Sequence, residues 1–222
     1  MPEFPESNVG PEPSARCDLC PRLNDFLVQS RVSEPSWHNA PVASFGESSA
    51  RLLIVGLAPG LRGANRTGRP FTGDYAGELL YGTLLELGFA TGSYAAHPGD
   101  GLTMTDAMIT NAVRCVPPEN KPTPAEVNTC RTFLANRIAA QSNLKAIVAL
   151  GRIAHDSTVV ALGHKRSAFP FAHAARHDIK PGLALFDSYH CSRYNTSTRV
   201  LTPEMFRDVF TSVKAFLGAP AA

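Results

Sequence analysis

The stretch Arg51-Leu-Leu-Ile-Val-Gly-Leu-Ala-Pro-Gly60 decides the fold of this chain. Residues 52–55 form a short apolar run that ends in glycine and proline, which predicts a fully buried strand. The next ten residues hold three arginines and no acid, and Phe71-Thr-Gly-Asp74 then opens a run with leucines at helical spacing. A buried strand, a glycine-rich basic loop and a helix in this order are typical of ligand sites in open α/β sheets.

The composition predicts a globular protein without a membrane span. The chain has 222 residues and five cysteines, with a formal net charge of +2. This length is ample for a real hydrophobic core. No apolar run approaches the roughly 18 residues of a membrane span, and the N-terminus lacks the basic-then-apolar order of a signal peptide. We therefore expect a cytoplasmic monomer, whose cysteines serve metal binding or chemistry rather than disulfides.

The charges are unevenly distributed. Residues 1–50 hold three basic and seven acidic side chains, whereas residues 151–199 hold seven basic and three acidic ones. Five of the seven histidines also fall in the second range. This asymmetry suits a polyanionic partner such as nucleic acid, although ordinary solvated surface charge produces it as well.

Strands and helices alternate along most of the chain. Apolar runs predict further strands over residues 106–114, 144–150 and 183–186, and helical patterns predict helices over 75–89, 123–141, 152–162 and 202–217. Residues 123–126 carry a capping box, Thr-Pro-Ala-Glu. Residues 163–182 read as a long polar loop with room for a short strand. We expect a three-layer α/β/α domain over residues 16–218, with a central, mostly parallel, four-stranded sheet, and a disordered tail over residues 1–15.

Four cysteines form two pairs in the sequence. Cys17 and Cys20 make a C-x-x-C motif before a proline, and Cys115 and Cys130 flank a proline-rich turn and a helix start. Zinc and an iron–sulfur cluster both use four thiolates, and the spacing alone slightly favours zinc, because structural zinc is commoner. Four unrelated buried cysteines are the alternative. Cys191 is left over, next to His190.

Three polar residues fall at or near the carboxyl ends of predicted strands. Asp74 is the only carboxylate between Glu47 and Glu78, and Asn111 and His190 end two other strands. Each has an ordinary explanation: a helix N-cap, a tied-down loop and a satisfied core histidine. Their common location favours a ligand site instead, because the crevices of parallel sheets form at this edge.

Four motifs together resemble those of the uracil-DNA glycosylase superfamily. They are Gly56-Leu-Ala-Pro-Gly60, Gly68-Arg-Pro-Phe-Thr-Gly-Asp74, Thr110-Asn-Ala-Val-Arg-Cys115 and His190-Cys-Ser-Arg-Tyr-Asn-Thr196. The chain is most similar to the fifth family, the B-type enzymes of bacteria and archaea, over residues 16–217. The resemblance implies a monofunctional DNA glycosylase that flips out and excises uracil, and other deaminated or damaged bases, from DNA. It also implies a [4Fe–4S] cluster held by Cys17, Cys20, Cys115 and Cys130.

The resemblance also implies roles for the pocket residues. Phe71 stands in the stacking position for the flipped base, and Asn111 can pair with the Watson–Crick edge of the base. His190 would stabilise the departing base. The first motif has no side chain that can activate water, so the catalytic carboxylate is predicted to be Asp74. The motif contributes the small pocket residues Gly56, Ala58 and Gly60, of which Gly60 stands where the family often has alanine.

DNA contacts are expected from two segments. The arginine loop and the last motif supply the predicted contacts to phosphate, from Arg62, Arg66, Arg69 and Arg193. The loop over residues 191–198 is predicted to enter the duplex with Arg193, Tyr194 and Asn195.

Two other function classes remain as alternatives. One is a non-catalytic nucleic-acid-binding module with zinc or an iron–sulfur cluster. The other is a nucleotide-binding α/β enzyme that uses the glycine-rich loop for phosphate. The second is weak, because neither G-x-G-x-x-G nor G-x-x-x-x-G-K-[ST] occurs in the chain.

Overall fold

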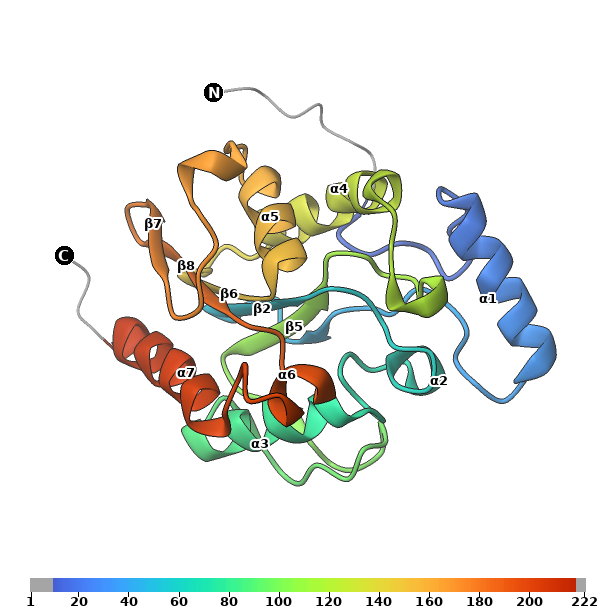
Figure 1. Ribbon diagram of the computed structural model, residues 1–222, viewed down its shortest axis with the longest axis horizontal. Helices are drawn as coiled ribbons and strands as arrows, with labels where there is room; N and C mark the ends of the chain where they lie inside the picture. The colour runs from blue at the N-terminus through green and yellow to red at the C-terminus, as the bar shows by residue number, and fades with distance from the viewer. Residues whose placement is uncertain (1–9, 219–222) are drawn as a thin grey trace.

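The computed structural model describes residues 10–218 and shows a three-layer α/β/α fold (Figure 1). The sheet has the strand order β1-β5-β2-β6-β8-β7. Its four central strands are parallel: β5 (Ala107–Asn111), β2 (Leu52–Gly56), β6 (Ala146–Leu150) and β8 (Leu183–Ser188). The predicted fold class and the four predicted strands are confirmed.

The predicted number of strands is wrong, because the sheet has six. β1 (Phe45–Gly46) and β7 (Arg176–Lys180) add antiparallel edges to the parallel centre. β1 is only two residues long. Three of the five side chains of β7 are exposed, and the strand is mostly polar. Neither therefore has the apolar run that reveals a central strand. A further two-stranded ribbon, β3 (Ala90–Thr91) with β4 (Thr103–Met104), lies in the segment that follows α3 (Tyr75–Leu87).

Helices cover both faces of the sheet. α4 (Pro124–Ala140) and α5 (Arg152–Ala161) lie on one face, and α3 and α7 (Pro203–Gly218) lie on the other (Figure 1). The predicted capping box of α4 is confirmed, since the Thr123 hydroxyl accepts from the Glu126 amide and the Glu126 carboxylate accepts from the Thr123 amide. α1 (Pro21–Ser33) and the short α2 (Ala64–Thr67) lie beside this layered body.

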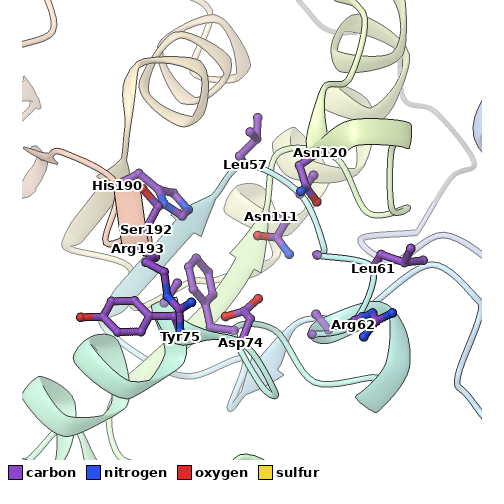
Figure 2. A pocket seen from close by; sticks show the side chains of 16 residues that line it. Leu57, Leu61, Arg62, Asp74, Tyr75, Asn111, Asn120, His190, Ser192 and Arg193 are labelled. Atoms are coloured by element: carbon purple, nitrogen blue, oxygen red, sulfur yellow. The ribbon is translucent and has the colours of Figure 1, made fainter. Parts of the chain in front are cut away.

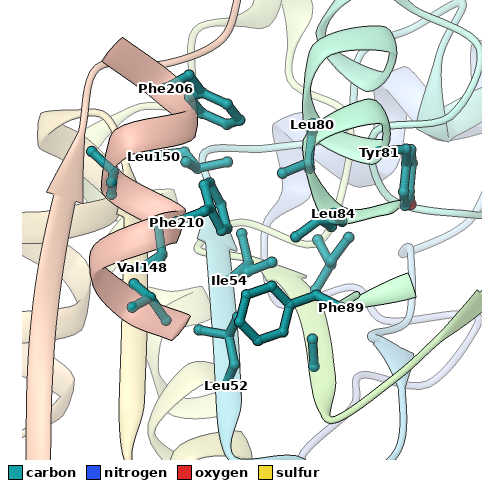
Figure 3. Close-up of a cluster of buried hydrophobic side chains, with 14 of the residues drawn as sticks. Leu52, Ile54, Leu80, Tyr81, Leu84, Phe89, Val148, Leu150, Phe206 and Phe210 are labelled. Carbon is teal, nitrogen blue, oxygen red and sulfur yellow. The ribbon is translucent and has the colours of Figure 1, made fainter. Parts of the chain in front are cut away.

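The core forms on both faces because the residues of β2 alternate in direction. Leu52 and Ile54 contact the α3 and α7 side, where Phe206 and Phe210 of α7 meet Leu80 and Leu84 of α3 (Figure 3). Leu53 and Val55 face the α4 and α5 side. Every residue of β2 is buried. A short strand without polar side chains is what a position in the middle of such a sheet requires.

The order of the strands determines where a ligand can bind. After β2 the chain adds β5 on one side of it and then β6 on the other. Successive connections therefore diverge at the carboxyl end of β2, which is the topological switch point where open α/β sheets form a crevice.

The N-terminal segment differs from the predicted disordered tail. Residues 1–9 lie outside the described part of the chain, but residues 10–15 are placed against the domain. Glu12 forms ion pairs with Arg114 at 2.7 Å and with Arg137 at 2.6 Å. Both arginines are buried, so the Glu12 carboxylate neutralises charges that would otherwise be costly. The prediction is wrong for this part of the tail.

No helix within residues 10–218 is both long enough and apolar enough to cross a lipid bilayer.

Candidate active site

A pocket of about 700 Å³ opens at the carboxyl ends of β2, β5 and β8 (Figure 2). It lies at the switch point that the strand order defines. Most of the predicted site residues meet there. The wall includes Ala58, Gly60, Arg62, Phe71, Asp74, Asn111, His190 and Arg193.

Phe71 forms an aromatic wall of this pocket. Its backbone has φ = 52°, a left-handed conformation that a bulky residue rarely adopts. Two tyrosine hydroxyls hold the segment: Tyr81 donates to the Pro70 carbonyl at 2.6 Å, and Tyr94 donates to the Phe71 carbonyl at 3.2 Å. The Phe71 ring lies 5.9 Å from that of His190, with 28° between the planes.

Gly56 and Asn111 lie behind this aromatic wall. A Cβ atom at position 56 would collide with Asn111 Oδ1 and would stand 2.6 Å from the Phe71 ring. Glycine therefore lets both side chains approach the end of β2. Asn111 is only 2% exposed, and its Oδ1 has no hydrogen-bond partner among the described residues. A buried acceptor without a partner is costly, so this amide is suited to a ligand that donates a hydrogen bond.

Asp74 stands at the N-cap position of α3 but makes no capping hydrogen bond with its side chain. Its Oδ1 is buried and has no hydrogen-bond partner in the part of the chain that the structure describes. Burial raises the pKa of the carboxyl above its usual value, and the amides of Ala76 and Gly77 oppose this rise. A Cβ atom at position 63 would collide with the carboxylate, and one at position 60 would come within 3.2 Å of it. Two glycines of the basic loop thus make room for this acid.

His190 enters the pocket two residues beyond the end of β8. Its backbone carbonyl accepts a hydrogen bond from Asn195 Nδ2 at 2.8 Å. The ring has no hydrogen-bond partner within residues 10–218. Burial without a neighbouring acid lowers the pKa of His190 to about 4, so the imidazole is neutral at pH 7. A neutral imidazole can still donate one hydrogen bond to a developing anion.

The rim of the pocket carries exposed cations and exposed aromatic rings. Arg62 and Arg66 are exposed on the basic loop, where Arg66 Nε donates to the Arg62 carbonyl at 2.9 Å. Arg193 lies over the Tyr75 ring at 5.3 Å. Tyr194 is 72% exposed. The predicted loop over residues 191–198 is mostly the short helix α6 (Arg193–Ser197), so these side chains stand on an ordered turn.

Arg69 is not a DNA contact, which corrects the prediction. It is 5% exposed and forms two hydrogen bonds to the Asp100 carboxylate, at 2.8 and 2.7 Å. The guanidinium holds the pKa of Asp100 well below its usual range. Arg69 Nε also donates to the Thr72 hydroxyl at 2.7 Å. The charge of Arg69 is therefore neutralised by Asp100 inside the protein, and its hydrogen bonds stabilise the segment that carries Phe71.

Several pocket residues were missed by the sequence interpretation. Asn120 lines the pocket from a tight turn in which both Glu119 and Asn120 have positive φ. The proline-rich turn was visible in the sequence, but nothing local shows that it folds over the end of β2. The other missed wall residues are Leu57, Leu61, Gly63, Ala64, Tyr75, Ala76 and Ser192.

The four predicted metal ligands share a second, smaller pocket. Cys17 and Cys20 precede α1, Cys115 follows β5 and Cys130 lies on α4. Leu23 and Phe133 contribute apolar walls. The Arg114 amide donates to Cys130 Sγ at 3.3 Å. Burial raises the pKa of the Cys115 thiol, and the other three cysteines raise it further, which places all four sulfur atoms in one neighbourhood.

The chemistry of this cysteine pocket suits a metal centre with thiolate ligands. Four converging thiols, apolar walls and an amide donor to sulfur suit an iron–sulfur cluster, whose properties depend on such hydrogen bonds.

Comparisons with known proteins show the family to which the chain is related. Residues 43–214 match the family model of the uracil DNA glycosylase superfamily. The chain is 43% identical over 208 residues to a type-5 uracil-DNA glycosylase of Thermus thermophilus, covering 91% of this chain and 94% of that protein. It is 39% identical to the type-5 enzyme of Mycobacterium tuberculosis, covering 91% of this chain and 78% of that protein. A type-4 uracil-DNA glycosylase of Pyrobaculum aerophilum is 32% identical, covering 67% of this chain and 62% of that protein.

Proposed function

The chain belongs to the uracil-DNA glycosylase superfamily, and we propose that it is a monofunctional DNA glycosylase that excises uracil and initiates base excision repair. The observation that carries this proposal is the pocket at the switch point. It brings together an aromatic ring, a neutral imidazole, and an amide and a carboxylate that each have one buried oxygen without a hydrogen-bond partner within residues 10–218. Other deaminated or damaged bases that fit the same pocket are further candidate substrates.

The residue types of the pocket suit a flipped pyrimidine. The face of the base stacks on Phe71, and Asn111 Oδ1 accepts from the imide N–H of uracil while the amide nitrogen donates to a carbonyl oxygen. Pairing with the base satisfies the orphaned acceptor. A base whose edge cannot donate to Asn111 leaves the buried acceptor unpaired and therefore binds less well than uracil.

The reaction separates charge, and the pocket has a group for each sign. The sugar gains positive charge as the N-glycosidic bond breaks, and the Asp74 carboxylate can stabilise it and position the attacking water. The departing base gains negative charge, and neutral His190 can donate a hydrogen bond to it. Asp74 and His190 enter the pocket from different elements, α3 and the end of β8.

The proposed function is tested with an end-labelled duplex that contains one uracil. We expect time-dependent abasic sites, detected as strand breaks only after alkali treatment, because a monofunctional enzyme leaves the backbone intact. The same duplex with cytosine at that position is the control. A protein that binds the uracil duplex but leaves the base in place would instead support the non-catalytic binding module.

A [4Fe–4S] cluster on Cys17, Cys20, Cys115 and Cys130 is the cofactor that we propose. Its role here is structural, because it would join the segment before α1 to the residue that follows β5 and to α4. The chain itself supplies the four thiols, the Arg114 amide and the apolar walls. This junction lies next to Ala58, which packs on the same hydrophobic cluster and also lines the candidate active site.

We expect anaerobically purified protein to carry about four iron and four sulfide per chain, with an absorption band near 400 nm. Cys115→Ser should lose most of the iron, because this thiol is buried among the other three. Cys191→Ser is the matched control. Cys191 is equally buried but points to the Ala76 carbonyl, so the variant should keep its full iron content. Stoichiometric zinc without iron or sulfide would contradict the proposed cluster.

Exposed arginines on the rim are expected to contact DNA phosphates. Each lost phosphate contact should reduce the slope of log K against log salt by about 0.9 on duplex DNA. The Arg62→Ala/Arg66→Ala variant should therefore show a shallower slope than the wild type. Arg207→Ala, on α7 and paired with Glu86, is the control and should leave the slope unchanged. Equal slopes for the wild type and the double variant would remove these residues from the interface.

Tyr194 is expected to fill the gap that the flipped nucleotide leaves in the duplex. It is highly exposed, planar and four residues beyond His190. Unstacking a base step costs a few kcal/mol, which an inserted ring can offset. Tyr194→Ala should thus impair excision from duplex DNA much more than from single strands. An equal loss on both substrates would indicate damage to the pocket.

A monomeric state and a cytoplasmic location stay predictions.

A further inference from the structure

A second set of ionisable side chains is buried close to the candidate active site. His155 on α5 lies 2.7 Å from Asp187 on β8, measured from Nδ1 to Oδ1. His177 on β7 approaches the other carboxylate oxygen, with Nε2 at 3.1 Å from Oδ2. The side chains of His155 and Asp187 are completely buried, and that of His177 is 12% exposed. The functional proposals above use none of these three residues.

The hydrogen bonds of His155 show where its protons lie. Nδ1 faces the Asp187 carboxylate, and Nε2 lies 2.8 Å from the Phe169 carbonyl oxygen. Both partners are acceptors, so both ring nitrogens must donate, and only the imidazolium form does this. The buried carboxylate then has a cation directly against it, which is what burial of a charge requires.

The surroundings of His155 are consistent with the charged form. Burial disfavours the charge, but the hydrogen bond and the charge of Asp187 outweigh it, and together they raise the pKa of His155. The Phe169 carbonyl and Asp156, on the same helix, act in the same direction. The rings of His177 and Phe171 make edge contacts with the His155 imidazole. The nearby guanidinium of Arg152 stacks over the Phe171 ring, 5.3 Å from its centroid.

This ion pair joins the two elements that position His190. Asp187 lies three residues before His190, and His155 lies in the first turn of α5. The His155 amide donates to the Gly151 carbonyl at 3.0 Å, and the Gly151 amide donates to the Ser188 carbonyl at 2.8 Å. Gly151 also abuts the catalytic candidate, since a Cβ atom there would lie 3.4 Å from His190 Cβ. The start of α5 and the end of β8 are therefore locked together beside the pocket.

We propose that His155 is a positioning residue, an imidazolium that is bonded to Asp187 and thereby holds the end of β8 so that His190 faces the departing base. The proposal rests on the proposed role of His190, because without that role there is no ring to position. It does not require His155 to touch the substrate. The protonation of His155 and the effect on catalysis can be measured separately.

The protonation is tested by nitrogen NMR on protein with labelled histidines, with His155→Leu used to assign the signal. We expect both ring nitrogens of His155 to carry protons at pH 7.5. This measurement needs neither DNA nor activity, so it stands even if the proposed function fails. A neutral tautomer at this pH would overturn the proposal.

The positioning role is tested by separating stability from rate. His155→Leu should lower the Tm by roughly 10 °C, because it leaves a buried carboxylate without its main partner. The His155→Leu/Asp187→Ala variant should regain most of this Tm, since no charge remains buried. Its single-turnover rate should nonetheless stay about tenfold below that of the wild type, because small displacements of a catalytic group are costly. Recovery of both Tm and rate would overturn the proposal.

Two further variants identify the residue through which His155 acts. In a His190→Ala background, His155→Leu should change the remaining rate less than twofold, because the ring it positions is absent. An undiminished tenfold loss in that background would overturn the proposal, whereas a fully active His190→Ala would instead refute the proposed function. His177→Phe is the matched control, since it leaves the His155–Asp187 bond intact and should alter the rate less than twofold. A tenfold loss there would assign the effect to general packing.

The pH dependence supplies a last discriminating readout. Because the pKa of His155 is raised, its contribution to stability is present below the unfolded value of about 6.5 and is lost as pH rises through the folded value. The wild type should therefore lose Tm and rate at alkaline pH more steeply than the His155→Leu/Asp187→Ala variant. Equal alkaline profiles would contradict this. A rise in wild-type Tm with added zinc, absent in the double variant, would show a metal site instead of a proton and would also overturn the proposal.

Discussion

The variant Asp74→Asn is expected to lower the single-turnover rate of uracil excision by about 10²–10⁴-fold. The substitution keeps the size of the side chain and its ability to form hydrogen bonds, but it removes the charge that positions water and stabilises the cationic sugar. No other acid lines the pocket within the described residues. The segment from β2 to α2 contributes only apolar, glycine and arginine residues to the pocket wall, so it has no substitute base.

The stability of the same variant distinguishes catalysis from helix capping. The amides of Ala76 and Gly77 act on the Asp74 carboxylate, and an asparagine oxygen can accept from the same amides, so Asp74→Asn should keep the wild-type Tm to within a few degrees. The pKa of Asp74 is raised in the folded state, so ionisation is less favourable there than in the unfolded chain. The contribution of Asp74 to the free energy of unfolding therefore falls as pH rises from 3.8 through its folded pKa. In Asp74→Asn the side chain stays neutral, so this pH-dependent fall in stability is absent.

The pH profile of the rate gives an independent check on Asp74. The carboxylate must be ionised to act, so the wild-type rate should fall as pH decreases through the raised pKa of Asp74. The residual rate of Asp74→Asn should lack this acid limb. Affinity for uracil-containing DNA should change little at pH 7. An Asp74→Asn enzyme with wild-type rate and profile would leave the water activator unassigned.

The parts of the fold that were predictable are those with a local signal. β2 is visible because all five of its residues are buried, and α4 is visible because its capping box is made of neighbouring residues. β7 is not visible, because an edge strand needs no apolar run and its only buried residue is Ile179. Local pattern thus found the centre of the sheet, missed β1, and allowed a short strand only somewhere within residues 163–182, where β7 lies.

The site shows the same division between local and distant information. Strand ends located Asp74, Asn111 and His190, and the family resemblance added Phe71; all four line one pocket. The sequence around Arg69 is as basic as that around Arg62, and only the fold shows that Asp100, 31 residues away, has taken its charge. Asn120 was missed for the same reason, since its place in the wall depends on how a turn folds over β2.

The buried ion pair also depends on contacts between residues that are distant in the sequence. His155 and Asp187 are 32 residues apart in the chain, and neither lies in a motif that the sequence interpretation singled out. A histidine on a helix reads as a core residue, and an aspartate near a strand end reads as a loop anchor. Only the parallel pairing of β6 with β8 brings the start of α5 against the end of β8. Motifs can locate the candidate active site, but the charges around it depend on long-range pairs such as His155 and Asp187.

Replacing His190 with alanine is expected to lower the single-turnover rate by about 10²–10³-fold, the usual effect of removing one donor to a developing anion. His190→Gln should restore part of the rate, because its amide can still donate a hydrogen bond. Binding of uracil-containing DNA should weaken much less, since the leaving base carries negative charge only in the transition state.

The protonation state of His190 makes this prediction specific. Burial lowers the pKa of His190 to about 4, so the ring is neutral at pH 7. The wild-type profile should then show no inflection near pH 6.5, and the acid limb that belongs to Asp74 should persist in His190→Ala. If the wild-type rate instead fell above about pH 6.5 and this alkaline fall were absent in His190→Ala, His190 would act as a cation. A cationic ring would need an acid beside it, and the pocket wall offers only Asp74, which would then have to serve the departing base and the sugar at once.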